Sequence, residues 1–204
     1  HARLRGAPVD RVPNQNILMA YAAHSIGKTY SQFAQDYRVL VEASLQAART
    51  YHLDWVSVIS DPVREVSAFG AVVHFPEDAV PFCEPLLSDY AHLDQLPVWD
   101  PWEKPRTCDR LLAVQSLRKQ VGGFLPISGW VEGAAAEAAM LLGVTRFLED
   151  TLIEPEQLTR LLERCNSQAI RFALDQLTAG ADIIGIGDAV CSLLSSAAYE
   201  QLAL

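Results

Sequence analysis

The sequence is short of positive charge and of long apolar runs. Its 204 residues include 16 Lys and Arg against 25 Asp and Glu, and no stretch gathers basic and aromatic side chains. A formal net charge of −9 is unfavourable for contact with phosphate backbones, so we expect no nucleic-acid partner. No apolar window approaches the about 20 residues of a membrane span, and the first residues, HARLRGAPVDRVP, lack the apolar core of a signal peptide. We therefore expect no membrane partner and a cytoplasmic location.

The sequence also lacks paired cysteines. Its four cysteines, Cys83, Cys108, Cys165 and Cys191, are far apart, form no CxxC pair and have no histidine at ligand spacing. Disulfide-rich domains and zinc-binding modules show closer spacings. We interpret the four cysteines as free thiols that act as small apolar side chains in a reducing compartment.

What the sequence does contain is a repeated pattern of short apolar runs that end in a carboxylate or a turn. In Leu53–Gly70, LDWVSVISDPVREVSAFG, the run Val56–Ser60 is typical of a strand covered on both faces, and Asp61 and a proline end it. The runs Gly123–Gly129 and Ala181–Asp188 follow the same pattern. In parallel α/β folds the chemistry gathers at the carboxyl ends of strands, so carboxylates at these ends are favoured as site residues.

Helical periodicity separates these runs, as expected for parallel strands joined by right-handed crossovers. A first strand is predicted at Asn16–Ala20 and a fourth at Ile183–Gly187. Repeated prolines from Ala71 to Arg106 predict a long connection of short strands and turns. Helices are predicted from a capping box at Thr29–Gln32 to about Tyr51, over Thr107–Lys119, from Gly129 to a closing Gly143, from Pro155 to Gly180, and from Ser195 or Ser196 onward.

The number of predicted units limits the architecture. With 204 residues and 50% hydrophobic content, the chain can form a single domain over residues 1–204. It has about four βα units, whereas a closed eight-stranded barrel usually needs about 250 residues. Four parallel strands cannot close, so both edge strands would leave backbone groups and apolar side chains without partners. We therefore expect an open sheet, or part of a larger barrel whose other half comes from a longer chain, a second polypeptide or a symmetry mate.

Four segments carry a resemblance to a known family. They are GAPVDRVP at 6–13, VSVISDPVREVSAFGAVVHFPED at 56–78, PISGWVEGAAAEAAMLLG at 126–143 and ADIIGIGDAVCSLLSSAAYEQL at 181–202. In this order they resemble the uroporphyrinogen decarboxylase superfamily, which contains the haem-pathway decarboxylase and the cobamide-dependent methyltransferases. The resemblance implies an α/β fold, the N-terminal part of a (β/α)8 TIM barrel with a long connection after the second strand. The C-terminal strands of that barrel would be absent from this chain.

Individual residues separate the two branches of this superfamily. The decarboxylase branch carries arginines in an RQAGRY loop after its first strand, which bind the carboxylates of a porphyrinogen. The equivalent stretch here, Met19–Lys28, is MAYAAHSIGK and contains no arginine. The aspartate of that branch matches Asp61, but its tyrosine falls near Ala139 or Met140 and its serine falls on Ala189. Decarboxylation is therefore the alternative reading and not the first.

The methyltransferase branch matches better, in the segments ISGWVEG and GADIIGIGDA. This resemblance implies methyl transfer between a methylcobamide, carried by a corrinoid protein, and a small-molecule acceptor such as a thiol. In that branch a zinc ion bound by a His-x-Cys pair and a later cysteine presents the acceptor as a thiolate. Those ligands follow the fourth strand, so zinc is expected only in a full-length protein, and Cys191 does not belong to the motif.

Five side chains are candidates for the site. Asp61 and Asp188 are the catalytic candidates because they end strands, and we expect Asp61 at the mouth of the sheet within reach of Asp188 or His24. His24, Trp130 and Glu132 are the substrate-binding candidates. Structural roles stay open for each of them: a turn or cap for the aspartates, a helix start for Glu132, a surface position for His24 and packing at the rim for Trp130.

Three functions are therefore weighed. The first is a methyltransferase, the second a carboxy-lyase acting on a porphyrinogen, and the third a non-catalytic fragment or binding scaffold. The charge of the cleft discriminates between the first two, because a porphyrinogen requires cations whereas a neutral or acidic mouth suits a cobamide partner. The existence of residues beyond Leu204 bears on the third.

Overall fold

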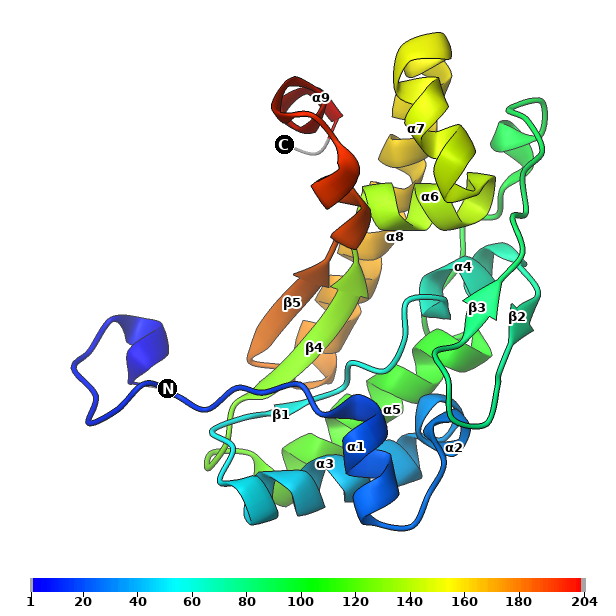
Figure 1. The fold of residues 1–204 in the computed structure, drawn as a ribbon. Helices are drawn as coiled ribbons and strands as arrows, with labels where there is room; N and C mark the ends of the chain where they lie inside the picture. Colours follow the sequence, from blue (N-terminus) through cyan, green and yellow to red (C-terminus); the bar gives the residue numbers. More distant parts are fainter. Residues whose placement is uncertain (1, 203–204) are drawn as a thin grey trace.

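The sheet of this protein is parallel and has three strands in the part of the chain that the structure describes, residues 2–202. In the computed structural model, β1 (Val56–Ser57), β4 (Ile127–Glu132) and β5 (Ile183–Gly187) lie side by side with β4 in the centre (Figure 1). Both pairings are parallel, and in the longer one Trp130 lies opposite Gly185. The carboxyl ends of all three strands therefore point toward one edge of the sheet.

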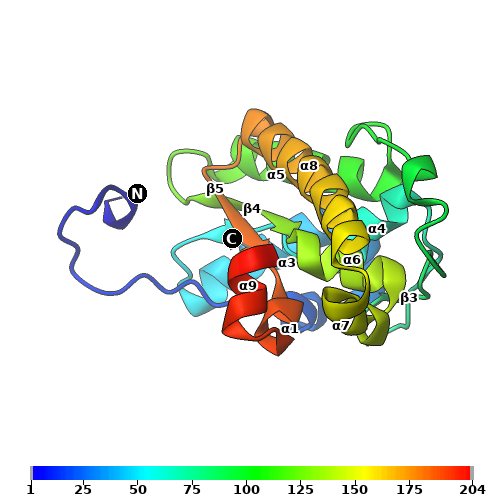
Figure 2. The ribbon, with the colours of Figure 1, turned by 90° about the horizontal axis from the view of Figure 1, so that it is seen from above.

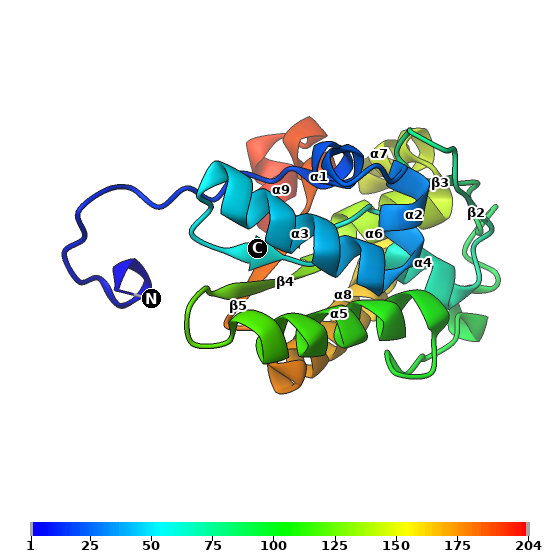
Figure 3. The same ribbon diagram turned by 90° about the horizontal axis from the view of Figure 1, so that it is seen from below.

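Three long helices form a layer against this sheet. α3 (Tyr37–Tyr51), α5 (Pro105–Val121) and α8 (Pro155–Ala179) pack against one another in this order and also contact the strands (Figures 2 and 3). Leu111 of α5 and Leu161 of α8 are fully buried in the core that the layer shares with the sheet. The connections between the strands thus supply most of the mass of the molecule.

The remaining elements are shorter. They are η1 (Arg3–Arg5), α1 (Met19–Ser25), α2 (Tyr30–Gln35), α4 (Arg64–Phe69), η2 (Leu93–Gln95), α6 (Ala134–Leu142), α7 (Val144–Ile153), η3 (Ala189–Leu193) and α9 (Ser196–Leu202). α4 follows β1 and α6 follows β4, so both helices begin beside the carboxyl edge of the sheet (Figure 1). Within residues 2–202, no helix combines the length and the apolar character that crossing a membrane requires.

The predicted first strand, Asn16–Ala20, is wrong. Residues 16–18 form no strand, and Met19 and Ala20 already belong to α1, whose Ala22 and Ala23 are buried where α1 packs on α3. A backbone hydrogen bond of 2.9 Å from Asp54 N to Asn14 O ties the segment to the start of β1, but no ladder follows. Small alanines favour a close helix–helix contact over a strand. The described sheet therefore has three strands instead of four.

Several other predicted boundaries are confirmed. β5 has the predicted bounds, and α8 begins and ends where its proline and its glycine predicted. The capping box is also present, since Gln32 N donates to Thr29 Oγ1 at 3.2 Å and Thr29 N donates to Gln32 Oε1 at 3.1 Å. The helix that starts there is interrupted at Asp36, whose side chain caps α3. The single helix predicted to Tyr51 is thus two helices.

The long connection after β1 is confirmed as a segment of turns and short strands. It contains the antiparallel hairpin of β2 (Val73–His74) and β3 (Phe82–Cys83), followed by irregular chain up to α5. Trp99 of this connection is buried against Phe69 and Phe172, with ring centroids 5.8 and 6.4 Å away. The connection is therefore anchored in the core and not only laid over the surface.

Two glutamines of α8 hold the backbones of distant tryptophans. Gln168 Oε1 accepts from Trp99 N at 2.8 Å, and its amide nitrogen donates to Trp99 O at 3.4 Å. Gln176 makes the same pair of bonds with the backbone of Trp130, at 2.8 and 2.9 Å. Gly129 leaves room for this, because a Cβ there would collide with the Gln176 side chain. The amide of Gln176 thus replaces a neighbouring strand beside Trp130, where β1 has already ended.

The outer edge of β5 is open. No described strand pairs with it, and Ile186 on this strand is 68% exposed. Open parallel edges with exposed aliphatic side chains are unusual in finished domains, which cover or blunt them. This edge is where the sequence predicted that further structure should pack.

Candidate functional site

Glu132 is the last residue of β4 and lies at the carboxyl edge of the sheet. Its side chain is 10% exposed. Trp130 Nε1 donates to Glu132 Oε1 at 3.1 Å, and Arg64 Nη2 lies 4.0 Å from the same oxygen. The backbone N–H of Glu132 donates to Glu65 Oε1 at 3.0 Å. The strand thus presents a nearly buried carboxyl group that still reaches the surface.

Beneath Glu132, α4 directs an ion pair into the interior. Arg64 and Glu65 have no exposed side-chain surface, and Nη2 lies 3.0 Å from Oε1. Arg64 also donates to the carbonyl of Asp61 at 3.2 Å, and its Cζ lies 5.9 Å from the ring centroid of Phe172. Burial opposes the charge, but the neighbouring carboxylates, Glu65 first, raise the pKa of Arg64 above its usual value. One permanent cation therefore serves several carboxyl groups.

α6 places another carboxyl group, Glu137, in the interior. It has no exposed surface, and neither of its oxygens has a hydrogen-bond partner. It lies near Glu65 and Glu132 and beside the thiol of Cys165 on α8. Burial, and then the charges of those two glutamates, raise the pKa of Glu137 well above its usual value. An unpartnered buried carboxylate is strongly disfavoured, so the environment of Glu137 favours the neutral acid over the charged form.

The pKa of Glu132 is raised too, to about 7. Burial and the charge of Glu65 raise this pKa, against the opposing charge of Arg64. A carboxyl group with this pKa can both accept and release a proton under physiological conditions. We call Arg64, Glu65, Glu132 and Glu137 together the glutamate cluster.

The carboxylate of Asp61, in the chain that follows β1, accepts hydrogen bonds from two neighbouring side chains. Arg106 Nη1 and Nη2 donate to its two oxygens at 3.2 and 2.6 Å, and the Ser60 hydroxyl donates at 2.7 Å. Burial would raise the pKa of Asp61, but the charge and hydrogen bonds of Arg106 hold it below the usual value. Asp61 is therefore ionised, with its oxygens engaged by the protein itself.

Trp130 lies across the glycines of β5. A Cβ at Gly185 or Gly187 would collide with the indole ring or press against it, so these positions need glycine. The indole N–H is directed at Glu132, as described above, which fixes the ring beside the glutamate cluster. Two of the predicted substrate-binding residues, Trp130 and Glu132, are thus brought together by the structure.

Comparison with known proteins identifies the family. A family model described as uroporphyrinogen decarboxylase (URO-D) matches residues 1–204. The chain belongs to the uroporphyrinogen decarboxylase family. Among curated relatives, a uroporphyrinogen decarboxylase of Synechococcus sp. is 24% identical over 98% of this chain and 58% of its own length. Another from Aeromonas salmonicida is 23% identical over 90% of this chain and 53% of its own length. The chain thus spans little more than half the length of these relatives.

A solved structure shares the fold of this family member. It is described as a methyltransferase from Methanosarcina mazei, superposes with a TM-score of 0.88 at 24% identity, and covers 99% of this chain and 62% of its own. The family model thus confirms the predicted superfamily, and a protein described as a methyltransferase shares the fold. The predicted fold class is confirmed as well: parallel strands and covering helices correspond to part of a longer α/β chain.

Asp188, the second catalytic candidate, lies after β5 and caps α6. Its carboxylate accepts from Ala136 N at 2.7 Å and from Ala135 N at 3.3 Å. A Cβ at Gly133 would collide with the Asp188 side chain, so the glycine permits this approach. Burial raises the pKa of Asp188, against the hydrogen bonds from Ala136, Cys191 and Ala135. The structure gives this family member a helix cap here, and a catalytic role for Asp188 stays a prediction.

His24 lies on the surface, and its side-chain partner is Asp78 and not a residue of the glutamate cluster. Its Nε2 lies 2.8 Å from Asp78 Oδ1, and about half of each side chain is exposed. Asp78 also accepts from Tyr30 N at 3.2 Å, and the Tyr30 hydroxyl donates to the carbonyl of Ser60. Within residues 2–202, no hydrogen bond or ion pair joins Asp61 to His24 or to Asp188, and a shared site for these residues stays a prediction.

The described residues of this family member do not fit a metal. No group of three or more His, Cys, Asp or Glu side chains within residues 2–202 is arranged to hold an ion. The carboxyl groups nearest to such an arrangement share Arg64, whose charge opposes a cation. We therefore derive no step through zinc.

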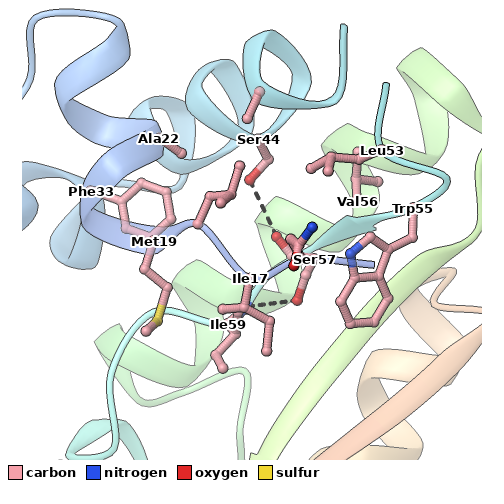
Figure 4. A pocket seen from close by; sticks show the side chains of 13 residues that line it. Ile17, Met19, Ala22, Phe33, Ser44, Leu53, Trp55, Val56, Ser57 and Ile59 are labelled. Carbon is pink, nitrogen blue, oxygen red and sulfur yellow. Dashed lines mark hydrogen bonds between the residues drawn. The ribbon is translucent and has the colours of Figure 1, made fainter. Parts of the chain in front are cut away.

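A small apolar cavity lies under the extended segment where the first strand was predicted. Figure 4 shows Ile17, Met19, Phe33 and Trp55 around it, with the hydroxyl of Ser57 at its polar side. Its volume of about 30 Å³ holds a water molecule and not a substrate. This cavity is a packing gap beside β1, and the glutamate cluster remains the candidate site.

Arg64, Glu65, Arg106 and Glu137 of this site were not predicted from the sequence. A signal was present, because Arg64 and Glu65 interrupt the apolar sequence VREV, and Glu137 interrupts a run of alanines. Charged residues on an otherwise apolar helix face are expensive to bury and so indicate either a surface or a paired interior site. To decide between a surface position and a paired interior site, one must know how α4 and α6 pack. The spacing of apolar residues in the sequence does not give this packing.

Proposed function

We propose that this chain is the N-terminal part of an enzyme that moves a methyl group between a cobamide, carried on a corrinoid protein, and a thiol or similar small acceptor. The corrinoid protein and the acceptor are its partners in this proposal, and the cytoplasm is its location. Family membership and the fold shared with a methyltransferase are consistent with this reaction. The two proteins differ too much in sequence for the activity to follow from the fold alone.

The observation that carries the proposal is the engagement of Asp61. This aspartate matches the one in the decarboxylase, but here Arg106 binds both of its oxygens. Arg64 is likewise committed to Glu65. Met19–Lys28 contains no arginine, and the ion pairs of Arg64 and Arg106 with carboxylates of the protein leave these two side chains poorly suited to bind the many carboxylates of a porphyrinogen.

The residues of the cluster suit a reaction in which one proton moves. Trp130 offers a planar face beside Glu132, on which a flat macrocycle or its side groups can stack. Glu132 can take the proton that a thiol loses when it becomes a nucleophile. In the resembling branch a zinc ion supplies the thiolate, and its ligands would come from residues outside those described. Asp188 and His24 keep their proposed roles as catalytic and substrate-binding residues.

The rival function is decarboxylation of a porphyrinogen. It is favoured by the names of the curated relatives, which are uroporphyrinogen decarboxylases. Anaerobic assays of the full-length protein separate the two reactions. We expect demethylation of a methylcobamide in the presence of a thiol, and no turnover of uroporphyrinogen III above the uncatalysed background. Turnover of uroporphyrinogen without thiol methylation would overturn the proposal.

The open edge of β5 supports a further part of the proposal. We infer that the remaining barrel half, from the same polypeptide or from a second copy, covers Ile186 and the free backbone groups of this strand. The native mass of the protein isolated from its source tests this. A stable 22.4 kDa monomer with a low affinity for apolar dyes would contradict it.

A further inference from the structure

Two carboxyl groups of the glutamate cluster carry unpaired oxygens although they are completely buried. Both oxygens of Glu137 and the Oε2 of Glu65 have no hydrogen-bond partner, and both residues have no exposed surface. Glu65 Oε1 accepts from Arg64 and from the backbone of Glu132, as a carboxylate does. Glu137 has no such donor. The geometry therefore assigns the negative charge to Glu65 and a proton to Glu137.

A proton on Glu137 removes a buried charge and adds a hydrogen-bond donor to the cluster. A protonated carboxyl group donates one hydrogen bond, and Glu65 Oε2 is an unused acceptor in the same cluster. The other oxygen of Glu137 can accept from the thiol of Cys165. Burial, and then the nearby Glu137, raise the pKa of Cys165 well above its usual value, so this thiol keeps its proton. Among these four groups, Cys165 and Glu137 are then neutral, and the negative charge of Glu65 is balanced by the positive charge of Arg64.

Glu132 is left as the group of this cluster that can change its charge. With Glu132 protonated, the cluster holds one cation and one anion. When Glu132 ionises, a second anion shares Arg64 at 4.0 Å and keeps the indole N–H of Trp130 as a donor. The charged or titratable groups that face Glu132 are Arg64 and Glu65 on α4, Glu137 on α6 and Asp61 after β1.

We propose that Glu132 is the proton-exchanging carboxyl group of this site, and that an ionised Glu65 and a permanently protonated Glu137 are positioning residues behind it. In the forward step an O–H bond forms at Glu132, an S–H or O–H bond of the bound substrate breaks, and the electron pair stays on the substrate atom. The reverse step returns the proton. The thiol as proton donor rests on the function proposed above, whereas the protonation pattern does not.

Infrared difference spectra of the full-length protein, recorded between about pH 5 and about pH 9, test this pattern. We expect one carboxylic-acid C=O band that disappears with a midpoint near neutral pH and another that persists throughout. Glu132→Gln should remove the titrating band only, and Glu137→Gln should remove the persistent band only. Glu149→Gln, at an exposed position of α7, is the matched control and should change neither.

Persistence of the titrating band in Glu132→Gln, or of the fixed band in Glu137→Gln, would overturn the proposal. If a variant does not fold, carbon-13 NMR of labelled glutamates in the unsubstituted protein replaces it. That spectrum must show one glutamate that stays protonated and another that titrates near neutral pH, and the absence of either contradicts the assignment.

The activity gives an independent readout. With a thiol acceptor, Glu132→Gln should lower kcat about 100-fold and remove the rise of the rate toward pH 7. Unchanged kcat and an unchanged pH profile would overturn the proton-exchange role. A protein that shows the predicted bands but transfers no methyl group refutes the proposed function and leaves the assignment of the fixed proton intact.

Discussion

The chain after β1 and the end of β4 carry the same chemical group, with pKa values shifted in opposite directions. Asp61 receives hydrogen bonds from Ser60 and from both terminal nitrogens of Arg106, and its pKa is lowered in spite of burial. Glu132 receives a single indole N–H and a shared guanidinium at 4.0 Å, and its pKa rises to about 7. Both carboxyl groups are nearly buried. The directions of their pKa shifts therefore follow from the donors and charges around each carboxyl group and not from its place at the sheet edge.

The strongest test of this comparison removes the cation that the two regions share. Arg64→Met leaves Glu65 buried without its partner and removes the guanidinium that lies 4.0 Å from Glu132. We expect the free energy of unfolding to fall by about 3–5 kcal/mol in urea titrations. Arg160→Met, which breaks an exposed pair with Asp94, should cost at most about 1 kcal/mol. A similar loss of unfolding free energy in both variants would show that burial does not increase the contribution of the Arg64 ion pair to stability.

Removing the charge at Asp61 should destabilise the protein in a pH-dependent way. Asp61→Asn leaves Arg106 with a neutral partner, at an expected cost of about 2–3 kcal/mol at pH 7. Because the folded-state pKa of Asp61 is lowered, its stabilisation is present above the usual aspartate pKa and is lost as the pH falls through the folded-state value. The difference between variant and unsubstituted protein should therefore shrink toward about pH 3. Equal differences at both pH values, measured by urea unfolding, would count against the paired state of Asp61.

Glu132 should show the opposite dependence. Its pKa is raised on folding to about 7, so the protonated carboxyl group favours the fold and stability is lost as the pH rises through that value. Glu132→Gln stays neutral, and we expect it to gain about 1–2 kcal/mol relative to the unsubstituted protein between about pH 5 and about pH 8. Glu149→Gln should give no such gain. Thermal unfolding at the two pH values is sufficient, and a variant that loses stability at the higher pH would reverse the interpretation.

Asp188 extends the comparison to a third carboxylate at the end of a strand, one that accepts hydrogen bonds from the start of α6. Asp188→Ala should lose about 1 kcal/mol of stability through the cap of α6, whereas Asp188→Asn should keep most of it. The same pair of variants tests the predicted catalytic role. If Asp188 only caps, Asp188→Asn retains turnover; a large loss of kcat in a stably folded Asp188→Asn protein would assign it to the chemistry.

The smallest effect is expected at His24. Its pair with Asp78 is about half exposed, so His24→Gln should change the free energy of unfolding by less than about 0.5 kcal/mol. An increase of KM at unchanged stability would support the predicted role in substrate binding. Unchanged kinetics would leave His24 as a surface residue.

The sequence predicted those elements whose ends carry strong local signals. The bounds of β5 follow from a short aliphatic run between a helix-ending glycine and an aspartate, and α8 follows from a proline start and one apolar face. The run Ile17–Ala23 had no such flanks, and it became extended chain followed by α1 because its alanines pack on α3. Local signals fail where two conformations have similar propensity and a tertiary contact decides.

Of the residues in the candidate site, only those on β4 were predicted from the sequence. Glu132 and Trp130 were named, and the structure joins them by a hydrogen bond. Their partners were not predicted, since Arg64, Glu65 and Glu137 come from helices whose rotation about their own axes sets whether a charge is buried. That rotation depends on packing between elements far apart in the sequence, and the spacing of apolar residues along one helix does not reveal it.

The two glutamines of α8 give this helix a role as a rigid spacer. Gln168 and Gln176 lie eight residues apart, about two turns, and each fixes the peptide groups of one tryptophan. The amide hydrogen of Trp130 should therefore exchange with solvent as slowly as one in a fully paired strand, although no strand pairs with it on that side. Gln176→Ala should accelerate this exchange locally. An axial shift of α8 would move Trp99 in the long connection and Trp130 beside Glu132 together, which mechanically couples that connection to the site.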